Sequence, residues 1–185
     1  MSGKEQIEVI IRPWSDGDLP LLMRLMGDPV MTEHLGGPET DEKIQRRHER
    51  YCRLGESGKD AMFVIVVGPD RIAAGSNGFW EREWRGQLVW ETGWSVLPEF
   101  QGRGVATMAT AEIVKKARAT GRHRFLHAFP SVDNGPSNSI CQKLGFTLEG
   151  AFDNEYPPGN FMRCNNWFLD LLVAVEFDAT ANAGK

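Results

Sequence analysis

The sequence predicts one α/β domain: a mixed, mostly antiparallel sheet of about six to seven strands, with helices on both faces. Three observations support this. The 185 residues suit a single domain. Strand-like segments alternate with segments of helical periodicity, and the continuous apolar run AMFVIVV is typical of a buried strand. We expect the domain to span residues 7–172 and residues 173–185 to form a flexible tail, because DATANAGK offers little to bury.

The N-terminal part predicts a strand followed by two helices. IEVIIRPW is a short strand pattern that ends at Pro13. In SDGDLPLLMRLMGDP, Ser15 or Asp16 can cap a helix that stops at Gly27. ETDEKIQRRHERYCRLG predicts a second, charged helix capped by Thr40, and a glycine-bearing loop, VMTEHLGGP, lies between the two helices.

The middle of the chain predicts further strands. RIAAGSNGFWER and QLVWETGWSVL flank EWRG, which favours an antiparallel hairpin. In the second segment, Leu88, Trp90, Trp94 and Val96 alternate with Val89, Glu91, Gly93 and Ser95. We expect the first set to face the core. A carboxylate among small residues in the second set predicts an open groove on the other face.

A long helix is predicted from about Gly104 to Thr120, with Gly121 closing it. RFLHAFPS then predicts a strand. NGPSNSICQKLGF predicts a short helix, with Pro136 near its first position and Gly145 just beyond its end. TLEGAFDNEY and FMRCNNWFLDLLV predict two strands joined by the turn-rich PPGN.

Composition narrows the function classes. The net charge of −4 argues against a dedicated nucleic-acid binder, which would show a basic excess. No apolar run approaches the roughly 20 residues that span a bilayer, and MSGKEQIEVIIRPW lacks the apolar core of a signal peptide. Cys52, Cys141 and Cys164 are odd in number and include no CxxC pair. We therefore expect a cytoplasmic protein without metal, membrane or nucleic-acid partners.

The stretch LPEFQGRGVATMA places Gln101, Gly102, Arg103 and Gly104 at the start of the long helix. A helix N-terminus has unpaired N–H groups and about half a positive charge, which suits a phosphate. The glycines leave room for a ligand near the backbone, and Arg103 can add a charged contact. Neither GxxxxGK[ST] nor a full GxGxxG is present. From these residues alone, a structural corner is an equal alternative.

WETGWSVLPEFQGRGVATMATAEIV resembles the signature of the GNAT superfamily of acyl-CoA N-acyltransferases. Its Q/R-x-x-G-x-G/A motif is matched by Gln101, Gly104 and Ala106, and NGPSNSICQKLGF matches a second family block that begins N-x-x-S. The likeness runs from about Ile7 to Leu172 and includes HLGGPET. It is closest to the branch that includes the ribosomal-protein N-terminal acetyltransferases, in which dimers are common.

The resemblance implies acetyl-CoA as cosubstrate. The backbone from Gln101 to Ala106 would cradle its pyrophosphate, and a bulge near Trp94–Val96 would splay the central strand so that its free backbone groups take the pantetheine arm. The implied cofactor-binding residues are Trp94, Ser95, Val96, Gln101, Gly102, Arg103, Gly104, Val105, Ala106, Asn134 and Ser137. Asn134 is also a good helix cap.

The resemblance further implies direct attack of an amine on the thioester in a ternary complex, with no acyl-enzyme. Glu91 is the candidate general base; the alternative is an exposed strand carboxylate. A backbone N–H near Val96 is the expected oxyanion donor. Where many family members carry a tyrosine as general acid, this chain has Cys141. Cys141 could protonate the leaving thiolate or simply fill the core, and the thiolate can also leave unprotonated.

The acceptor would be a protein N-terminus or a small-molecule amine. The candidate substrate-binding residues are His34, Trp80, Trp84, Glu155 and Tyr156. The tryptophans could instead just pack. The acidic segment with Asp153 and Glu155 favours a cationic amine, or is a solvated turn. His127 is expected to be a satisfied core histidine.

Two rival functions remain at this stage. One is a catalytically inactive acyl-CoA-binding sensor or interaction domain, which the missing tyrosine favours. The other is a nucleic-acid-binding domain, which the acidic balance opposes. Glu91 beside an open groove favours the enzyme.

Overall fold

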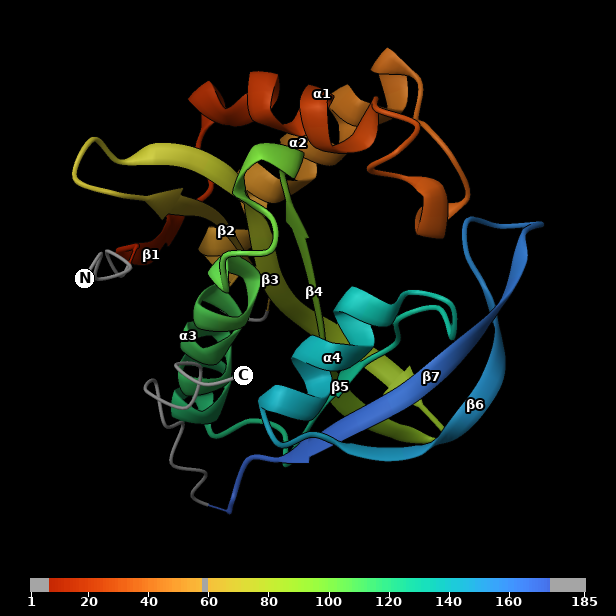
Figure 1. Cartoon of the computed structure of the whole chain (residues 1–185). Coiled ribbons are helices and arrows are strands. Elements are labelled where there is room, and N and C mark those ends of the chain that lie inside the picture. The colour runs from red at the N-terminus through yellow and green to blue at the C-terminus, as the bar shows by residue number, and fades with distance from the viewer. Residues whose placement is uncertain (1–6, 58–59, 174–185) are drawn as a thin grey trace, which may run out of the picture.

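The computed structural model describes residues 7–57 and 60–173 of the chain (Figure 1). In chain order the main elements are β1 (Val9–Pro13), α1 (Leu19–Met26), α2 (Asp41–Ser57), β2 (Ala61–Val67), β3 (Ile72–Trp84), β4 (Gln87–Val96), α3 (Val105–Thr120), β5 (Phe125–Ala128), α4 (Gly135–Lys143), β6 (Thr147–Glu155) and β7 (Phe161–Asp170). The predicted order of strands and helices is confirmed. Of the tail predicted at 173–185, residues 174–185 lie outside the described residues.

The seven strands form one sheet in the order β1-β2-β3-β4-β5-β7-β6. β4 and β5 run parallel, and the other neighbours pair antiparallel. The sheet is therefore mixed and mostly antiparallel, as predicted.

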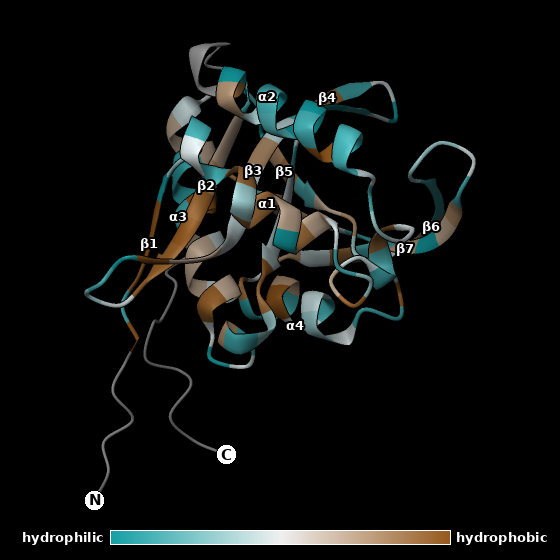
Figure 2. Cartoon of the chain, turned by 90° about the horizontal axis from the view of Figure 1, so that it is seen from above, coloured by the Kyte–Doolittle hydropathy of each residue, from teal (hydrophilic) through white to brown (hydrophobic). Residues whose placement is uncertain are grey.

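Helices cover both faces of the sheet. Met62, Val64 and Val66 of β2 share a core cluster with α1 and α2, whereas Phe63 and Ile65 belong to the clusters that contain α3. Figure 1 shows α1 and α2 on one side of the strands and α3 and α4 on the other. Figure 2 shows the matching colours: β2 is hydrophobic, and much of α2 is hydrophilic. Because helices cover both faces of β2, its segment AMFVIVV is apolar at every position.

The hairpin between β3 and β4 turns more tightly than EWRG suggested. Arg85 and Gly86 have φ angles of 50° and 77°, so they form a two-residue turn of the type that matches strand twist. β3 continues to Trp84, which pairs with Gln87. One consequence corrects a prediction: Leu88 was expected in the core, but it pairs with the exposed Glu83 near the turn and is 59% exposed.

β4 separates from β5 halfway along its length. The two strands pair at Trp90 and Glu91, and β4 then continues along β3 alone. This separation is the splay that the resemblance implied. The expected bulge in β4 is absent, since its register with β3 has no shift; the irregularity lies between β2 and β3, after Ile65. β3 and β4 approach each other closely at Gly75. A Cβ at this position would lie 2.1 Å from the Ser95 carbonyl oxygen, so only glycine fits there.

Candidate functional site

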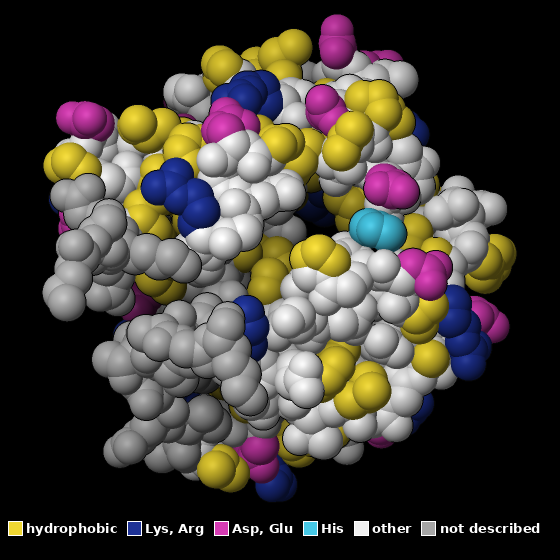
Figure 3. All heavy atoms as spheres, viewed as in Figure 1, with side chains coloured by type: hydrophobic (Ala, Val, Ile, Leu, Met, Phe, Trp, Pro, Cys, Tyr) yellow, Lys and Arg dark blue, Asp and Glu magenta, His cyan; other side chains and the backbone are white. Residues whose placement is uncertain are grey.

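A cavity of about 640 Å³ opens where β4 leaves β5. Its walls come from α1 and the loop after it, α2, β3, β4, the segment after β5, the start of α4 and the β6–β7 hairpin. Figure 3 shows the surface hollowed between the α1 and α4 sides. The predicted residues that line the cavity are Glu91, Trp94, Ser95, Asn134, Ser137, His34, Trp80, Glu155 and Tyr156. One cavity thus unites the candidate base, the pantetheine side and most of the acceptor side.

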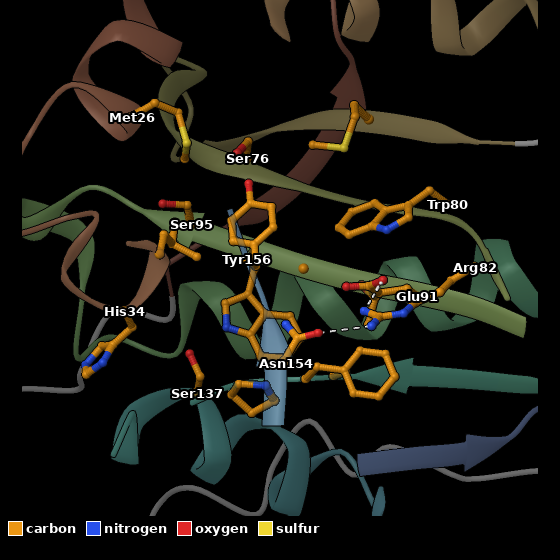
Figure 4. A pocket seen from close by; sticks show the side chains of 18 of the residues that line it. Met26, His34, Ser76, Trp80, Arg82, Glu91, Ser95, Ser137, Asn154 and Tyr156 are labelled. Atoms are coloured by element: carbon orange, nitrogen blue, oxygen red, sulfur yellow. Dashed lines mark hydrogen bonds and ion pairs between the residues drawn. The ribbon is translucent and has the colours of Figure 1, made fainter. Parts of the chain in front are cut away.

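Glu91 faces this cavity from the last position at which β4 pairs with β5. Its Oε2 accepts a hydrogen bond of 2.9 Å from Nη1 of Arg82, and Nη2 of Arg82 donates to Oδ1 of Asn154 at 3.1 Å (Figure 4). The Arg82 guanidinium also stacks over the Phe129 ring at 4.4 Å. Sequence reasoning missed Arg82 and Asn154. Two-residue alternation from Trp80 puts Arg82 on the groove face, but its partner depends on the hairpin register.

Trp80 lies directly opposite Glu91 in the β3–β4 register and points into the cavity (Figure 4). Its indole covers Gly93: a Cβ on Gly93 would lie 3.0 Å from Cη2 of Trp80. A side chain at position 93 would therefore require the indole to shift by a few tenths of an ångström. The groove face predicted for β4 is confirmed at Glu91, Gly93 and Ser95, which all line the cavity.

Arg47 of α2 ties the β6–β7 hairpin to the helix across the cavity wall. Its guanidinium donates to Glu39, to the hydroxyl of Tyr51 at 3.2 Å and to the hydroxyl of Tyr156 at 2.9 Å. Burial disfavours its charge, but the bond to Glu39 and the two tyrosines outweigh burial and hold the pKa of Arg47 above its ordinary value. The same bond lowers the pKa of Glu39. Arg47 was missed because its helix looked like a charged surface helix.

The loop that carries His34 packs against the same hairpin. Gly36 has a φ of +87°, and a Cβ there would lie 2.5 Å from Cδ of Pro157. His34 and Tyr156, far apart in sequence, therefore line one wall of the cavity. Within the hairpin, Glu155 accepts a hydrogen bond of 2.8 Å from the backbone N–H of Gly159.

The glycine turn before α3 is held by Gln101, whose side chain donates a 2.7 Å hydrogen bond to the carbonyl oxygen of Val96. Gly102 and Gly104 have φ angles of +70° and +79°, which favour glycine. A Cβ on Gly102 would meet nothing within 4 Å, and one on Gly104 only Cε of Met108 at 3.7 Å. The space over the turn is thus open, which leaves room for a ligand at the helix N-terminus.

The predicted cofactor-binding residues divide into two groups. Trp94, Ser95, Asn134 and Ser137 line the cavity, whereas the turn from Gln101 to Ala106 lies outside its wall. The side chains of Val96 and Val105 are buried in the core, so these two residues offer a ligand only their backbone. Asn134 caps α4 as expected: its Oδ1 accepts a 3.0 Å hydrogen bond from the backbone N–H of Ser137.

Two predicted site residues lie elsewhere. Cys141 has no exposed surface, belongs to the core cluster beneath α4, and burial raises its pKa to about 12. We therefore do not assign it the general-acid role, and the alternative of a core filler describes its surroundings. Trp84 is not part of the cavity wall; it packs against Phe129 and Phe152, with ring centroids 4.7 Å apart in both pairs. Trp84 lies two residues after Arg82, at the turn end of β3, and this position is outside the cavity.

His127 and Asp153 match the simpler interpretations. His127 is buried, and its Nδ1 lies 2.8 Å from Oδ1 of Asn166, so it is a satisfied core histidine as predicted. Asp153 pairs with Arg163 at 3.0 Å on the exposed side of the C-terminal hairpin. These two residues belong to the scaffold of the site.

Asp16, His48 and Cys52 bring their potential metal ligands within 4.8 Å of one another, away from the cavity. However, the indole N–H of Trp14 donates to Nδ1 of His48 at 3.1 Å. The neutral imidazole then carries its proton on Nε2, which faces Sγ of Cys52 at 3.7 Å. A metal ion at Nε2 would have to displace that proton, so this donor set does not fit one.

Within residues 7–57 and 60–173, no helix combines the length and apolarity needed to cross a membrane.

Comparison with known proteins identifies the domain. Residues 8–147 match the family model described as "Acetyltransferase (GNAT) domain". The "Uncharacterized N-acetyltransferase YnaD" of Bacillus subtilis (strain 168) is 27% identical over 99 residues, which are 53% of this chain and 56% of that protein. The match thus spans about half the length of this curated relative.

Solved structures show the same architecture. Spermidine N-acetyltransferase from Vibrio cholerae, in complex with CoA and spermine, superposes with a TM-score of 0.72 at 15% identity, over 89% of this chain and 98% of that one. The Salmonella typhimurium acetyl transferase that modifies the N-terminal serine of ribosomal protein L7/L12 has a TM-score of 0.71 at 20% identity, over 90% and 96%. At these identities the likeness shows the fold alone.

Proposed function

The chain belongs to the GNAT acetyltransferase family, and on that premise we propose that it moves the acetyl group of acetyl-CoA to a primary amine by direct attack in a ternary complex. The observation that carries this proposal is the position of Glu91. It faces the cavity from the last paired residue before β4 and β5 part, beside Ser95, Asn134 and Ser137. A carboxylate, unpaired strand backbone and a helix start therefore meet in one space.

Acetyl-CoA fits the two groups of predicted residues. The open turn from Gln101 to Ala106 offers backbone N–H groups and the positive end of α3 to the pyrophosphate. The pantetheine arm would lie between β4 at Trp94–Val96 and the start of α4, where Asn134 and Ser137 line the cavity. In this arrangement the thioester would lie near the point where β4 and β5 separate.

In the proposed reaction, Glu91 takes a proton from the acceptor ammonium, directly or through water. The neutral amine attacks the thioester carbonyl, and a backbone N–H near Val96 stabilises the oxyanion that forms. As the tetrahedral intermediate collapses, the N–C bond remains, the C–S bond breaks and CoA leaves as the thiolate, while the nitrogen gives up its second proton to water and becomes a neutral amide. With Cys141 in the core, we propose no side-chain proton donor for this thiolate.

The rival function is an acyl-CoA-binding sensor that no longer catalyses. To separate the two, the protein is incubated with acetyl-CoA and a panel of primary amines, while release of the CoA thiol is followed. Amine-dependent thiol release supports the transferase. If CoA stabilises the protein against heat but no amine in the panel causes release of the CoA thiol, the sensor is favoured instead.

We also propose that this activity is cytoplasmic. Cys52, Cys141 and Cys164 are free thiols, which is the usual state of cysteines in a reducing compartment. Acceptors of both kinds, protein N-termini and small amines, occur there. The cavity walls distinguish between these acceptors.

A further inference from the structure

Charged side chains line the cavity, and two of its carboxylates are paired with cationic side chains. Four carboxylates and three guanidinium groups line it. Each carboxylate has a partner: Glu91 pairs with Arg82, Glu81 pairs with Arg122 and His123, Asp60 accepts from the backbone N–H of Glu81, and Glu155 accepts from that of Gly159. Arg47 is in turn paired with Glu39. At Glu91 and Glu81, a second ammonium group of a polycation would have to compete with a cationic partner already in place.

Aromatic and methionine side chains form much of the cavity lining. They are Trp80, Tyr51, Tyr156, Met26, Met31 and Met62, of which all but Tyr156 belong to or pack on one core cluster. We call these six residues the apolar chamber. Aromatic rings and thioethers pack well against an apolar or aromatic body. Trp80 borders Glu91 across the strand pair, so the chamber adjoins the candidate base.

The hydrogen bond from Arg47 to Tyr156 closes the wall of this chamber on the hairpin side. Tyr156 projects into the cavity from the end of β6, and Arg47 is held in place by Glu39. The whole cavity, including its pantetheine end, has about 640 Å³, a size typical of small-molecule sites. A site of this size favours a compact acceptor over a protein chain.

Resting on the proposed acetyl transfer, we infer that the acceptor is a small monoamine with an aromatic or other apolar body. The body lies in the apolar chamber and the single amine meets Glu91. The inference excludes polyamines and protein N-termini as preferred acceptors. It concerns acceptor choice alone, so its failure leaves acetyl transfer itself standing.

Matched amine pairs test this. Phenethylamine and ethylamine differ by a phenyl ring, and hexylamine and 1,6-diaminohexane differ by one charge. We expect kcat/KM for phenethylamine to exceed that for ethylamine by about tenfold or more, and hexylamine to be preferred over the diamine. A preference for 1,6-diaminohexane, spermidine or a serine-initiated peptide would overturn the inference while supporting acetyl transfer.

Substitutions test whether Trp80 determines the expected preference for phenethylamine over ethylamine. In Trp80→Ala the phenethylamine-to-ethylamine ratio should fall toward one, and Trp80→Phe, which keeps a ring, should restore much of it. Trp84→Phe, in the same hairpin but outside the cavity, should leave the ratio unchanged. CoA-induced thermal stabilisation checks that each variant is folded. An unchanged ratio in a folded Trp80→Ala protein would remove Trp80 from the chamber.

Calorimetry separates the two possible failures. If no amine releases the CoA thiol, the proposed function fails, and titration of phenethylamine into CoA-loaded protein decides the inference by itself. Binding that is tighter than that of ethylamine and is weakened in Trp80→Ala supports the chamber. Equal or undetectable binding of both amines overturns it.

Discussion

Arg82 holds Glu91 by a 2.9 Å hydrogen bond and is itself tied to Asn154 at 3.1 Å. The candidate base on β4 is therefore oriented by β3 and by the C-terminal hairpin at once. Orientation matters because a general base must meet the reacting proton within hydrogen-bond distance.

Glu91→Gln keeps the shape of the side chain but cannot take a proton. We expect turnover to fall about a hundredfold or more, with CoA affinity nearly unchanged. Thiol release and CoA titration measure the two quantities. Glu83→Gln, an exposed carboxylate on the neighbouring strand, is the matched control. A wild-type rate in Glu91→Gln across pH would remove Glu91 from the base role.

Gly104→Glu tests the pyrophosphate site. The side chain and its negative charge would enter the open space over the turn, and CoA binding should be lost. Because Gly104 has a positive φ, backbone strain must be controlled. Gly121→Glu imposes similar strain at the other end of α3, where φ is +62°, and it should keep CoA affinity. If a folded Gly104→Glu protein binds CoA normally, the phosphate assignment is wrong.

Arg47→Met breaks the tie between α2 and the C-terminal hairpin and leaves Glu39 without its partner. We expect the free energy of unfolding to fall by about 1–3 kcal/mol and the KM for the acceptor to rise several-fold, while the KM for acetyl-CoA stays constant. Denaturant unfolding and steady-state kinetics provide these values.

Two further variants sharpen that test. Tyr156→Phe removes one of the hydrogen bonds of Arg47 and should raise the acceptor KM at little cost in stability. Arg46→Met alters the adjacent guanidinium, which is 73% exposed and pairs with Glu42 within the helix, and should change neither quantity. Equal effects from positions 46 and 47 would contradict the proposed tie.

The three thiols should differ in reactivity. Cys141 and Cys164 are buried, Cys52 is partly exposed, and burial raises the pKa of each. In the native protein an alkylating reagent should modify Cys52 slowly and spare the other two, whereas all three should react in denaturant. Mass spectrometry of digested protein identifies the sites. Rapid native labelling of Cys141 would place it outside the core.

Cys141→Ser separates packing from catalysis. A hydroxyl in this apolar cluster should lower the free energy of unfolding by about 1–3 kcal/mol, while kcat remains near wild type below the unfolding temperature. A large loss of kcat with unchanged stability would restore Cys141 as a candidate acid.

Asp18 should make stability depend on pH in acid. Burial opposes its charge, but hydrogen bonds from Arg12 and Ser15 outweigh burial and hold its pKa below the ordinary value. The stabilisation is complete above the ordinary pKa of about 4 and is lost as pH falls through the lower folded pKa.

Denaturant unfolding between about pH 6 and pH 2 measures this loss. Asp18→Asn should be less stable than wild type at neutral pH and should lose less stability below about pH 4. Asp70→Asn, in an exposed turn, should follow the wild-type curve. If Asp18→Asn and wild type run parallel, Asp18 is not the group responsible.

Structural features that depend only on residues close together in the chain could be predicted from local sequence patterns. The open space over Gly102 and Gly104, the cap at Asn134 and the groove face at Glu91 each follow from neighbours a few positions away. The same holds for the order of strands and helices, because periodicity is a property of the segment itself.

Relations between distant segments could not be predicted in this way. The partner of Glu91 depends on Arg85 adopting a positive φ, which residues other than glycine rarely do. The contact between Arg47 and Tyr156 joins positions 109 residues apart. Trp84 and Cys141 carry chemistry that suits a site, and only the tertiary packing shows that they lie outside it.

The absence of a side chain at Gly93 offers a simple way for acceptor specificity to change during evolution. Since a Cβ on that glycine would lie 3.0 Å from the Trp80 indole, even an alanine at 93 would shift the indole by a few tenths of an ångström, and a bulkier side chain would shift it further. Such a substitution would change the shape of the proposed acceptor side while the glycine turn before α3 stays intact. Descendants of such a chain could exchange one amine for another and inherit the acetyl donor unchanged.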